Sequence, residues 1–223
     1  MTLHLVTARL ALLAALAGAG VLAHAQAGAP VFTAPPGALM TQPQPGEPAR
    51  FVRDPRELAQ SAIELYRDTC ASAMGNFTGA VDAALNLGLQ PYRPSDPHAV
   101  DTLLGGAPGD VYAMPETAEL LQLAVTSDGR CTVWVHQADG PKVRAGFVAV
   151  VDAMKARGAS VSPTRERFVD VGGVTRQQTG FSVRAASTPP GSATTMVFEA
   201  VTQSVARPGT QALTVAAPAT AAR

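Results

Sequence analysis

The chain has 223 residues, with 17 basic (Lys and Arg) and 17 acidic (Asp and Glu) side chains, so its formal net charge at pH 7 is zero. This balance, with no basic run anywhere, argues against a nucleic-acid partner, which needs a concentrated positive surface. The length fits one domain with additional tails. Alanine, arginine and proline are abundant and lysine is scarce, which suggests a bacterium with a GC-rich genome.

The N-terminus has the pattern of a secretory signal peptide. Arg9 precedes an apolar run from Leu10 to Leu22, and Ala23-His24-Ala25 has the small-x-small form of a signal-peptidase site. The run is shorter than the ~20 residues of a membrane span. We therefore expect residues 1–25 to be a signal peptide cleaved before Gln26, no transmembrane segment in the mature chain, and a periplasmic protein.

Composition divides the remaining chain into three parts. Residues 26–50 are rich in proline, alanine, glycine and glutamine without periodicity, which predicts a flexible tether. Residues 51–204 contain the periodic segments and are expected to form a single domain. Residues 205–223 are again rich in alanine, proline and threonine and are expected to be a frayed tail.

Three helices are predicted in the first half of the domain. The first begins at Asp54, with Pro55 at the first helical position and Glu57 completing a capping box, and ends at Gly75. Shorter helices are expected from Gly79 to Leu87 and from Asp96 to Leu104. The apolar stripe of the first helix consists of Leu58, Ala62, Leu65, Tyr66, Cys70 and Ala73.

Glu119 to Gln137 is predicted to form a β-hairpin around Asp128-Gly129, a dipeptide that suits a two-residue type I′ turn. This turn pairs Thr126 with Cys131 and Leu123 with Trp134. One face then carries Gln122, Ala124, Thr126, Cys131, Val133 and Val135. The other face carries Leu121, Leu123, Val125, Thr132, Trp134 and His136. Both faces are largely apolar, so we expect the sheet to be covered on both sides.

The remaining elements define the expected fold class. A short strand at Val111–Met114 precedes the hairpin, and an amphipathic helix follows it from Pro141 to Gly158. Strands are then expected at Arg165–Val171, Gly180–Ser187 and Thr194–Gln203. The prediction is an α+β fold, an antiparallel sheet of about five strands with N-terminal helices and one crossover helix. Profilin-like and PAS-like domains share this order, which is an analogy of fold alone.

Cys70 and Cys131 are the two cysteines of the chain. In an exported protein we expect them to form one disulfide, and two buried free thiols are the alternative. The bond would place the first helix on the Cys131 face of the hairpin. A catalytic cysteine is disfavoured, because neither residue has a neighbouring base in the sequence and no C-x-x-C pair exists.

Four segments together suggest a relationship. ELYRDTC, LGLQP, LLGGAPGDVY and DGRCTVWVHQ resemble a family of small uncharacterised exported proteins of proteobacteria, with a helix cysteine, an LGGAPG segment and a DGxC strand. The resemblance extends from about Leu65 to Phe198. It implies this architecture and export, and it implies no mechanism.

No motif assigns a chemistry. His98 and His136 are the only histidines after residue 25, too few for a catalytic zinc site, and no nucleophile elbow occurs. The Gly105–Gly109 run lacks the Lys-Ser/Thr of a phosphate-binding loop and predicts a tight connection packed against the sheet. We therefore expect no catalytic residue, no cofactor and no metal.

The sequence favours a non-enzymatic periplasmic module that binds a protein or small molecule, and the candidate face carries Leu123, Trp134 and His136. Two alternatives are a hydrolase or transferase with its site near His136 and a structural accessory of an envelope or secretion assembly. A cleft at His136 would indicate the enzyme, and an exposed apolar patch at Trp134 the binding module. A paired strand edge at Thr194–Gln203 would indicate the assembly.

Overall fold

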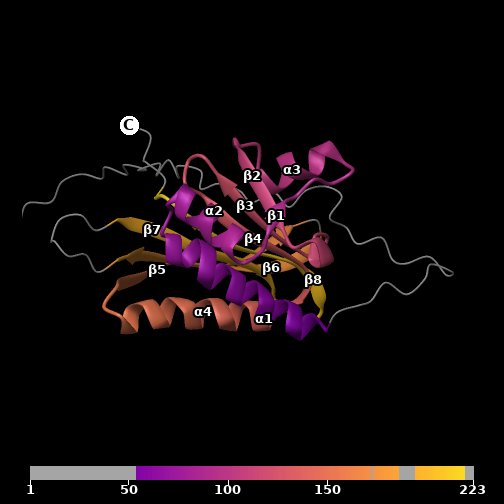
Figure 1. Cartoon of the computed structure of the whole chain (residues 1–223). Coiled ribbons are helices and arrows are strands. Elements are labelled where there is room, and N and C mark those ends of the chain that lie inside the picture. Colours follow the sequence, from indigo (N-terminus) through magenta and orange to yellow (C-terminus); the bar gives the residue numbers. More distant parts are fainter. Residues whose placement is uncertain (1–53, 172, 186–193, 219–223) are drawn as a thin grey trace, which may run out of the picture.

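The computed structural model describes residues 54–171, 173–185 and 194–218, and Figure 1 shows how the elements are arranged. The predicted signal peptide and tether, residues 1–50, lie outside the described residues. The helices are α1 (Pro55–Tyr66), the π-helical turn η1 (Arg67–Ala71), α2 (Phe77–Asn86), α3 (Pro97–Leu104), the 3-10 turn η2 (Pro115–Thr117) and α4 (Gly140–Ala156). The strands are β1 (Gln90–Pro91), β2 (Gly109–Ala113), β3 (Leu121–Thr126), β4 (Cys131–Asp139), β5 (Ser160–Val171), β6 (Val174–Arg184), β7 (Thr195–Gln203) and β8 (Pro208–Ala216).

All eight described strands form one antiparallel sheet in the order β1-β2-β3-β4-β8-β7-β6-β5. The predicted α+β class is confirmed, but five strands was too few. Chain connection explains the order: α4 carries the chain from β4 to the far edge at β5, and the last four strands then return to the middle. The sheet thus consists of two halves that meet where β4 pairs with β8.

The prediction of a frayed tail over residues 205–223 is wrong for Pro208–Ala216, which form β8 in the middle of the sheet. Leu213 and Val215 are fully buried on one face, while Thr210, Ala212 and Thr214 alternate with them on the other. The period of two is present in the sequence. Small and polar residues occupy every other position, however, so the composition of the segment resembles that of an unstructured tail.

Helices α1 and α4 lie side by side on the same face of the sheet (Figure 1). α1 packs on β4, and α4 packs on β7 and β8. The core between them contains a group of buried aromatic rings, in which Tyr66 lies 5.9 Å from Phe147 and 6.3 Å from Phe198 between ring centroids. In the far half of the sheet, Phe181 and Phe198 pack against Phe147 and Tyr66 on this face. On the other face, Gln178 donates to Glu199.

The long N-terminal helix follows the predicted pattern. Asp54 caps α1, since its carboxylate accepts a hydrogen bond from the Arg56 amide at 2.8 Å. The predicted stripe is buried except at Ala73, which is partly buried, and the stripe continues through the π-turn to Cys70. Cys70 forms a disulfide with Cys131 of β4 across a sequence separation of 61 residues. The predicted bridge is therefore present, and it joins α1 to the middle of the sheet.

The predicted hairpin is present, but its register is shifted by one residue. Cys131 pairs with Val125 rather than Thr126, and Trp134 pairs with Gln122 rather than Leu123. The loop has three residues, of which Gly129 alone has a positive φ (83°), as in turns closed by a glycine bulge. The Gly129 backbone also contacts the Gly75 carbonyl, leaving no room for a Cβ. A one-residue shift moves a whole strand to the opposite face.

The register places the predicted face residues differently. Leu123 lies with Cys131 in the helix-covered core and is fully buried, so it does not share a face with Trp134 and His136. Trp134 packs under α3, and its indole donates to the Leu103 carbonyl at 3.1 Å. Of the glycines in the Gly105–Gly109 run, predicted to pack against the sheet, only Gly109 at the start of β2 does so closely, because a Cβ there would clash with the Val125 carbonyl. A Cβ at Gly106 would meet nothing within 4 Å.

None of the helices in the described ranges is long and apolar enough to cross a membrane.

Candidate functional site

A groove opens on the helix-covered side of the sheet, between α1, the turn that connects α2 to β1, and the segment from β2 to β3. Its volume is about 250 Å³. Leu65, Leu89 and Leu121 are nearly buried and form the floor. The remaining lining residues are Ser61, Glu64, Asp68, Leu87, Met114 and Thr117. We call this site the α1 groove.

One wall of the α1 groove is apolar and exposed. Leu87 is 41% exposed and Met114 is 39% exposed, although both belong to a residue class that is usually buried. Leu85, 49% exposed at the end of α2, does not line the groove. Leu87 and Met114 thus add exposed apolar surface to the hollow above Leu65, Leu89 and Leu121, and contiguous apolar surface is what interaction sites use.

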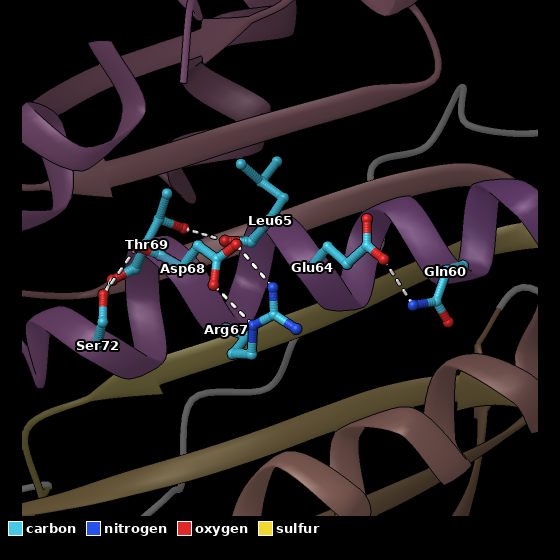
Figure 2. A network of polar contacts seen from close by, with 7 residues as sticks. All are labelled: Gln60, Glu64, Leu65, Arg67, Asp68, Thr69 and Ser72. Atoms are coloured by element: carbon cyan, nitrogen blue, oxygen red, sulfur yellow. Dashed lines mark hydrogen bonds and ion pairs between the residues drawn. The ribbon is translucent and has the colours of Figure 1, made fainter. Parts of the chain in front are cut away.

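The opposite wall is polar and belongs to α1. Ser61, Glu64, Leu65 and Asp68 are spaced at three- and four-residue intervals, so they lie on one stripe of the helix. Figure 2 shows how their carboxylates are held: Gln60 donates to Glu64 at 2.7 Å, and Arg67 binds both oxygens of Asp68 at 2.7 and 2.9 Å. The bond from Arg67 lowers the pKa of Asp68, so this carboxyl group is ionised at neutral pH.

The π-turn η1 begins next to the groove and ends at the disulfide. Within this turn the Thr69 hydroxyl donates to the Leu65 carbonyl at 2.6 Å, and Ser72 donates to the Asp68 carbonyl at 2.8 Å (Figure 2). These bonds satisfy backbone acceptors where helical pairing is irregular. The π-turn thus directs Asp68 to the groove and Cys70 to β4, and the disulfide anchors the polar wall.

His136 lies on the other face of the sheet, away from the α1 groove, in a network with Thr210 and Gln122. Its Nδ1 is 3.0 Å from the Thr210 hydroxyl, and its Nε2 is 3.1 Å from the Gln122 side-chain carbonyl oxygen. A carbonyl oxygen only accepts, so Nε2 carries the proton and Nδ1 accepts from Thr210. Burial lowers the pKa of His136 to about 4. The ring is therefore neutral at physiological pH.

The Thr210–His136–Gln122 arrangement resembles a nucleophile, a base and an orienting group. Three observations count against this interpretation. Thr210 is only 5% exposed, so a substrate has little access to its hydroxyl. A base with a pKa of about 4 accepts a proton poorly at pH 7. A glutamine also supplies no charge to stabilise an imidazolium ion. These observations favour a structural role for the network over a catalytic one.

The surroundings of His136 explain its structural role. β4 contains a β-bulge between Val135 and Ala138, and Gln137 has a φ of 62° there. The fully buried Gln211 side chain donates to the Ala138 carbonyl at 3.1 Å and accepts from the Gln203 amide at 2.6 Å. These side chains replace ladder bonds at the end of the sheet where β7 and β8 separate, which accounts for several buried polar residues.

His136 makes the stability of the protein depend on pH. Its folded-state pKa of about 4 lies below its ordinary value of 6.5, so the unfolded chain binds more protons between these values. We therefore expect the free energy of unfolding to be complete above pH 6.5 and to fall as the pH drops toward 4, by up to about 3 kcal/mol. Urea unfolding at pH 7.5, 6, 5 and 4.5 measures this change.

The control is His136→Gln, which removes the titrating ring and should flatten this part of the pH profile. His98→Gln, at an exposed position of α3, should leave the profile unchanged. Equal slopes for the wild type and His136→Gln would contradict the assignment.

The groove residues were not predicted as a site. The sequence places Leu87 at the end of an expected helix and Met114 at the end of an expected strand, and it assigns no role to Glu64 or Asp68. Leucine at the C-terminal cap of α2, followed by Gly88 and Leu89, was the only local signal. The groove brings together residues of α1 and η1 with Leu87, Leu89, Met114, Thr117 and Leu121, which no local sequence pattern links.

Comparisons with known proteins add no assignment: no protein-family model, no curated protein and no solved structure matches the chain. The resemblance to exported proteobacterial proteins stays a prediction. No cluster of three or more potential metal ligands occurs within the residues that the structure describes. The disulfide is consistent with a compartment outside the cytoplasm, because such bonds persist in oxidising environments.

Proposed function

We propose that this protein is a non-enzymatic periplasmic module that binds a partner through the α1 groove. The proposal rests on one observation above all: an apolar hollow has two partly exposed apolar side chains, Leu87 and Met114, on its wall. The predicted signal peptide and tether support a periplasmic location, and the disulfide agrees with it.

The composition of the groove favours binding over catalysis. Its polar groups are two carboxylates, a serine and a threonine, without a histidine, lysine or cysteine among the lining residues. Both carboxylates are exposed. Arg67 lowers the pKa of Asp68, so Asp68 does not resemble a carboxyl group with a raised pKa that donates a proton. A catalytic role for the distant His136 is the second candidate, because of its contact with Thr210.

The assembly alternative rested on an open strand edge at Thr194–Gln203. Thr195–Gln203 is β7, which pairs with β6 on one side and β8 on the other, so this strand has no open edge for a partner. A structural accessory would have to use another surface than β7.

Site-specific photo-crosslinking in the native cell tests the proposal. A benzophenone amino acid at position 87 should give a covalent adduct of discrete mass after irradiation, because Leu87 lines the groove. The same group at position 85 is a matched control, since Leu85 is similarly exposed at the same helix end but lies outside the lining. Adducts at both positions, or at neither, would contradict a binding role for the groove.

A further inference from the structure

We propose that the occupant of the α1 groove is a peptide segment of a partner protein in which an apolar side chain is followed closely by a lysine or arginine. This inference rests on the proposed binding function and adds the chemistry of the partner. It is carried by the size of the groove, by the distribution of charge on its walls and by the nature of its apolar residues.

Size favours a side chain over a whole small molecule. Pockets for small molecules and cofactors typically measure about 300–1,000 Å³ and enclose most of the ligand. The α1 groove, at about 250 Å³, lies below this range and opens to solvent along α1. It has room for one or two large apolar side chains, while the backbone that carries them would lie along the opening. Leu65, Leu89 and Leu121 supply the apolar floor that such an anchor needs.

Charge favours a basic neighbour. Two carboxylates, Glu64 and Asp68, line one wall, and no lysine or arginine is among the lining residues. Within the described part of the chain, Glu64 forms no ion pair and takes a single hydrogen bond from the neutral amide of Gln60. Its second oxygen is therefore available to an incoming cation. Asp68 already pairs with Arg67, so Glu64 is the principal contact for a lysine or arginine of the partner.

The two walls match a segment with two kinds of side chain. Leu87 and Met114 line the same groove as the carboxylates of α1, so an apolar anchor and a basic residue a few positions away can be bound together. Methionine adapts its shape to different apolar partners, so Met114 is suited to pack against the apolar side chain of a partner. An acidic segment would be repelled by the same stripe, and this gives the groove a preference.

The test is selection from a displayed library of random 12-residue peptides on the mature full-length protein. We expect enriched sequences to contain leucine, isoleucine, phenylalanine or methionine with a nearby lysine or arginine, and to be depleted of aspartate and glutamate. The most enriched peptide is then synthesised and its Kd measured by fluorescence polarisation. Glu64→Gln should weaken binding about tenfold, a typical loss for a charge pair at an interface.

Two matched controls separate charge and shape. Asp82→Asn removes an exposed carboxylate of α2 that does not line the groove and should change Kd by less than about twofold, as expected for a charge outside the contact. Leu87→Lys should abolish binding, whereas Leu85→Lys should leave it intact. Circular dichroism and urea unfolding of each variant confirm that the fold is preserved.

The outcomes distinguish this inference from the proposed function. If position 87 crosslinks a partner but selected peptides are uncharged or acidic, or Glu64→Gln binds as the wild type does, the peptide chemistry is wrong and the binding role stands. If position 87 crosslinks a second copy of this chain, and sedimentation shows a dimer that Leu87→Lys dissociates, the occupant is a second copy and the inference is overturned. If neither crosslinks nor groove-dependent peptides are found, both proposals fail.

Discussion

Truncation of the chain after Gln203 is expected to abolish the folded state, because it removes β8. This strand pairs with β4 on one side and β7 on the other, so its loss leaves no strand pairing between the two halves of the sheet. It also removes Leu213 and Val215 from the core. The lost burial and ladder bonds exceed the roughly 5–15 kcal/mol that separates most domains from unfolding. Far-UV circular dichroism and urea titration should show no cooperative transition.

A truncation after Pro218 is the control, since it keeps all of β8 and should unfold at the wild-type urea concentration. Leu213→Ala gives an intermediate case that remains measurable if the shorter chain aggregates. Its side chain is fully buried, so the substitution should cost about 2–5 kcal/mol. A chain ending at Gln203 that unfolds cooperatively with native stability would show that β8 is dispensable.

Replacing both cysteines by alanine is expected to lower the free energy of unfolding by about 4 kcal/mol. The bond closes a loop with a sequence separation of 61 residues, and the chain-entropy argument gives ~4 kcal/mol for a loop of this length. For a protein of this size we expect a fall in Tm of roughly 2–4 °C for each kcal/mol. Differential scanning calorimetry of the purified mature protein measures the shift.

Reduction of the wild-type protein provides the matched comparison. Both sulfur atoms are buried, with Cys70 fully enclosed and Cys131 2% exposed, so reductant should act only on the unfolded chain. Wild-type protein reduced in denaturant and refolded with reductant should melt near the double-alanine variant. A variant whose Tm lies within about 2 °C of the oxidised wild type, less than a 1 kcal/mol effect, would remove the bond from the account of stability.

Local signals in the sequence were sufficient for the helices and for the disulfide. Asp54 caps α1 and Gly105 ends α3 in a left-handed conformation, as their residue types indicate. The stripe that contains Cys70 could be recognised from the sequence because helical periodicity depends only on near neighbours. These features need no knowledge of which strand pairs with which.

Features that depend on distant partners were predicted wrongly. The hairpin register was taken from Asp128-Gly129 alone, whereas the loop also fits against Gly75 and therefore has one more residue. The assignment of Leu123 to the face of Trp134 and His136 followed from that register and was wrong with it. β8 was missed because its pattern becomes meaningful only when β4 and β7 lie on either side of it.

The α1 groove could not be predicted for the same reason. Ser61, Glu64 and Asp68 form a recognisable stripe on α1, but a stripe of polar residues on a helix usually faces solvent. Leu87 and Met114 are far apart in the sequence and come together only through the packing of α2 and β2 beside α1. By contrast, the burial of His136 has a local cause in the bulge of β4, although the sequence does not indicate where that bulge occurs.

The position of β8 also sets the order in which this chain can mature. Every element that touches the disulfide on its own half of the sheet, from α1 to β4, is complete by residue 139, so oxidation of Cys70 and Cys131 does not require β8. The pairing of Cys131 with Val215 does require it, and contacts this distant in sequence form slowly. A chain that crosses a membrane N-terminus first would thus acquire its covalent bond before its sheet is closed. In the crosslinked half, one side of β4 would stay unpaired until β8 adds to the sheet.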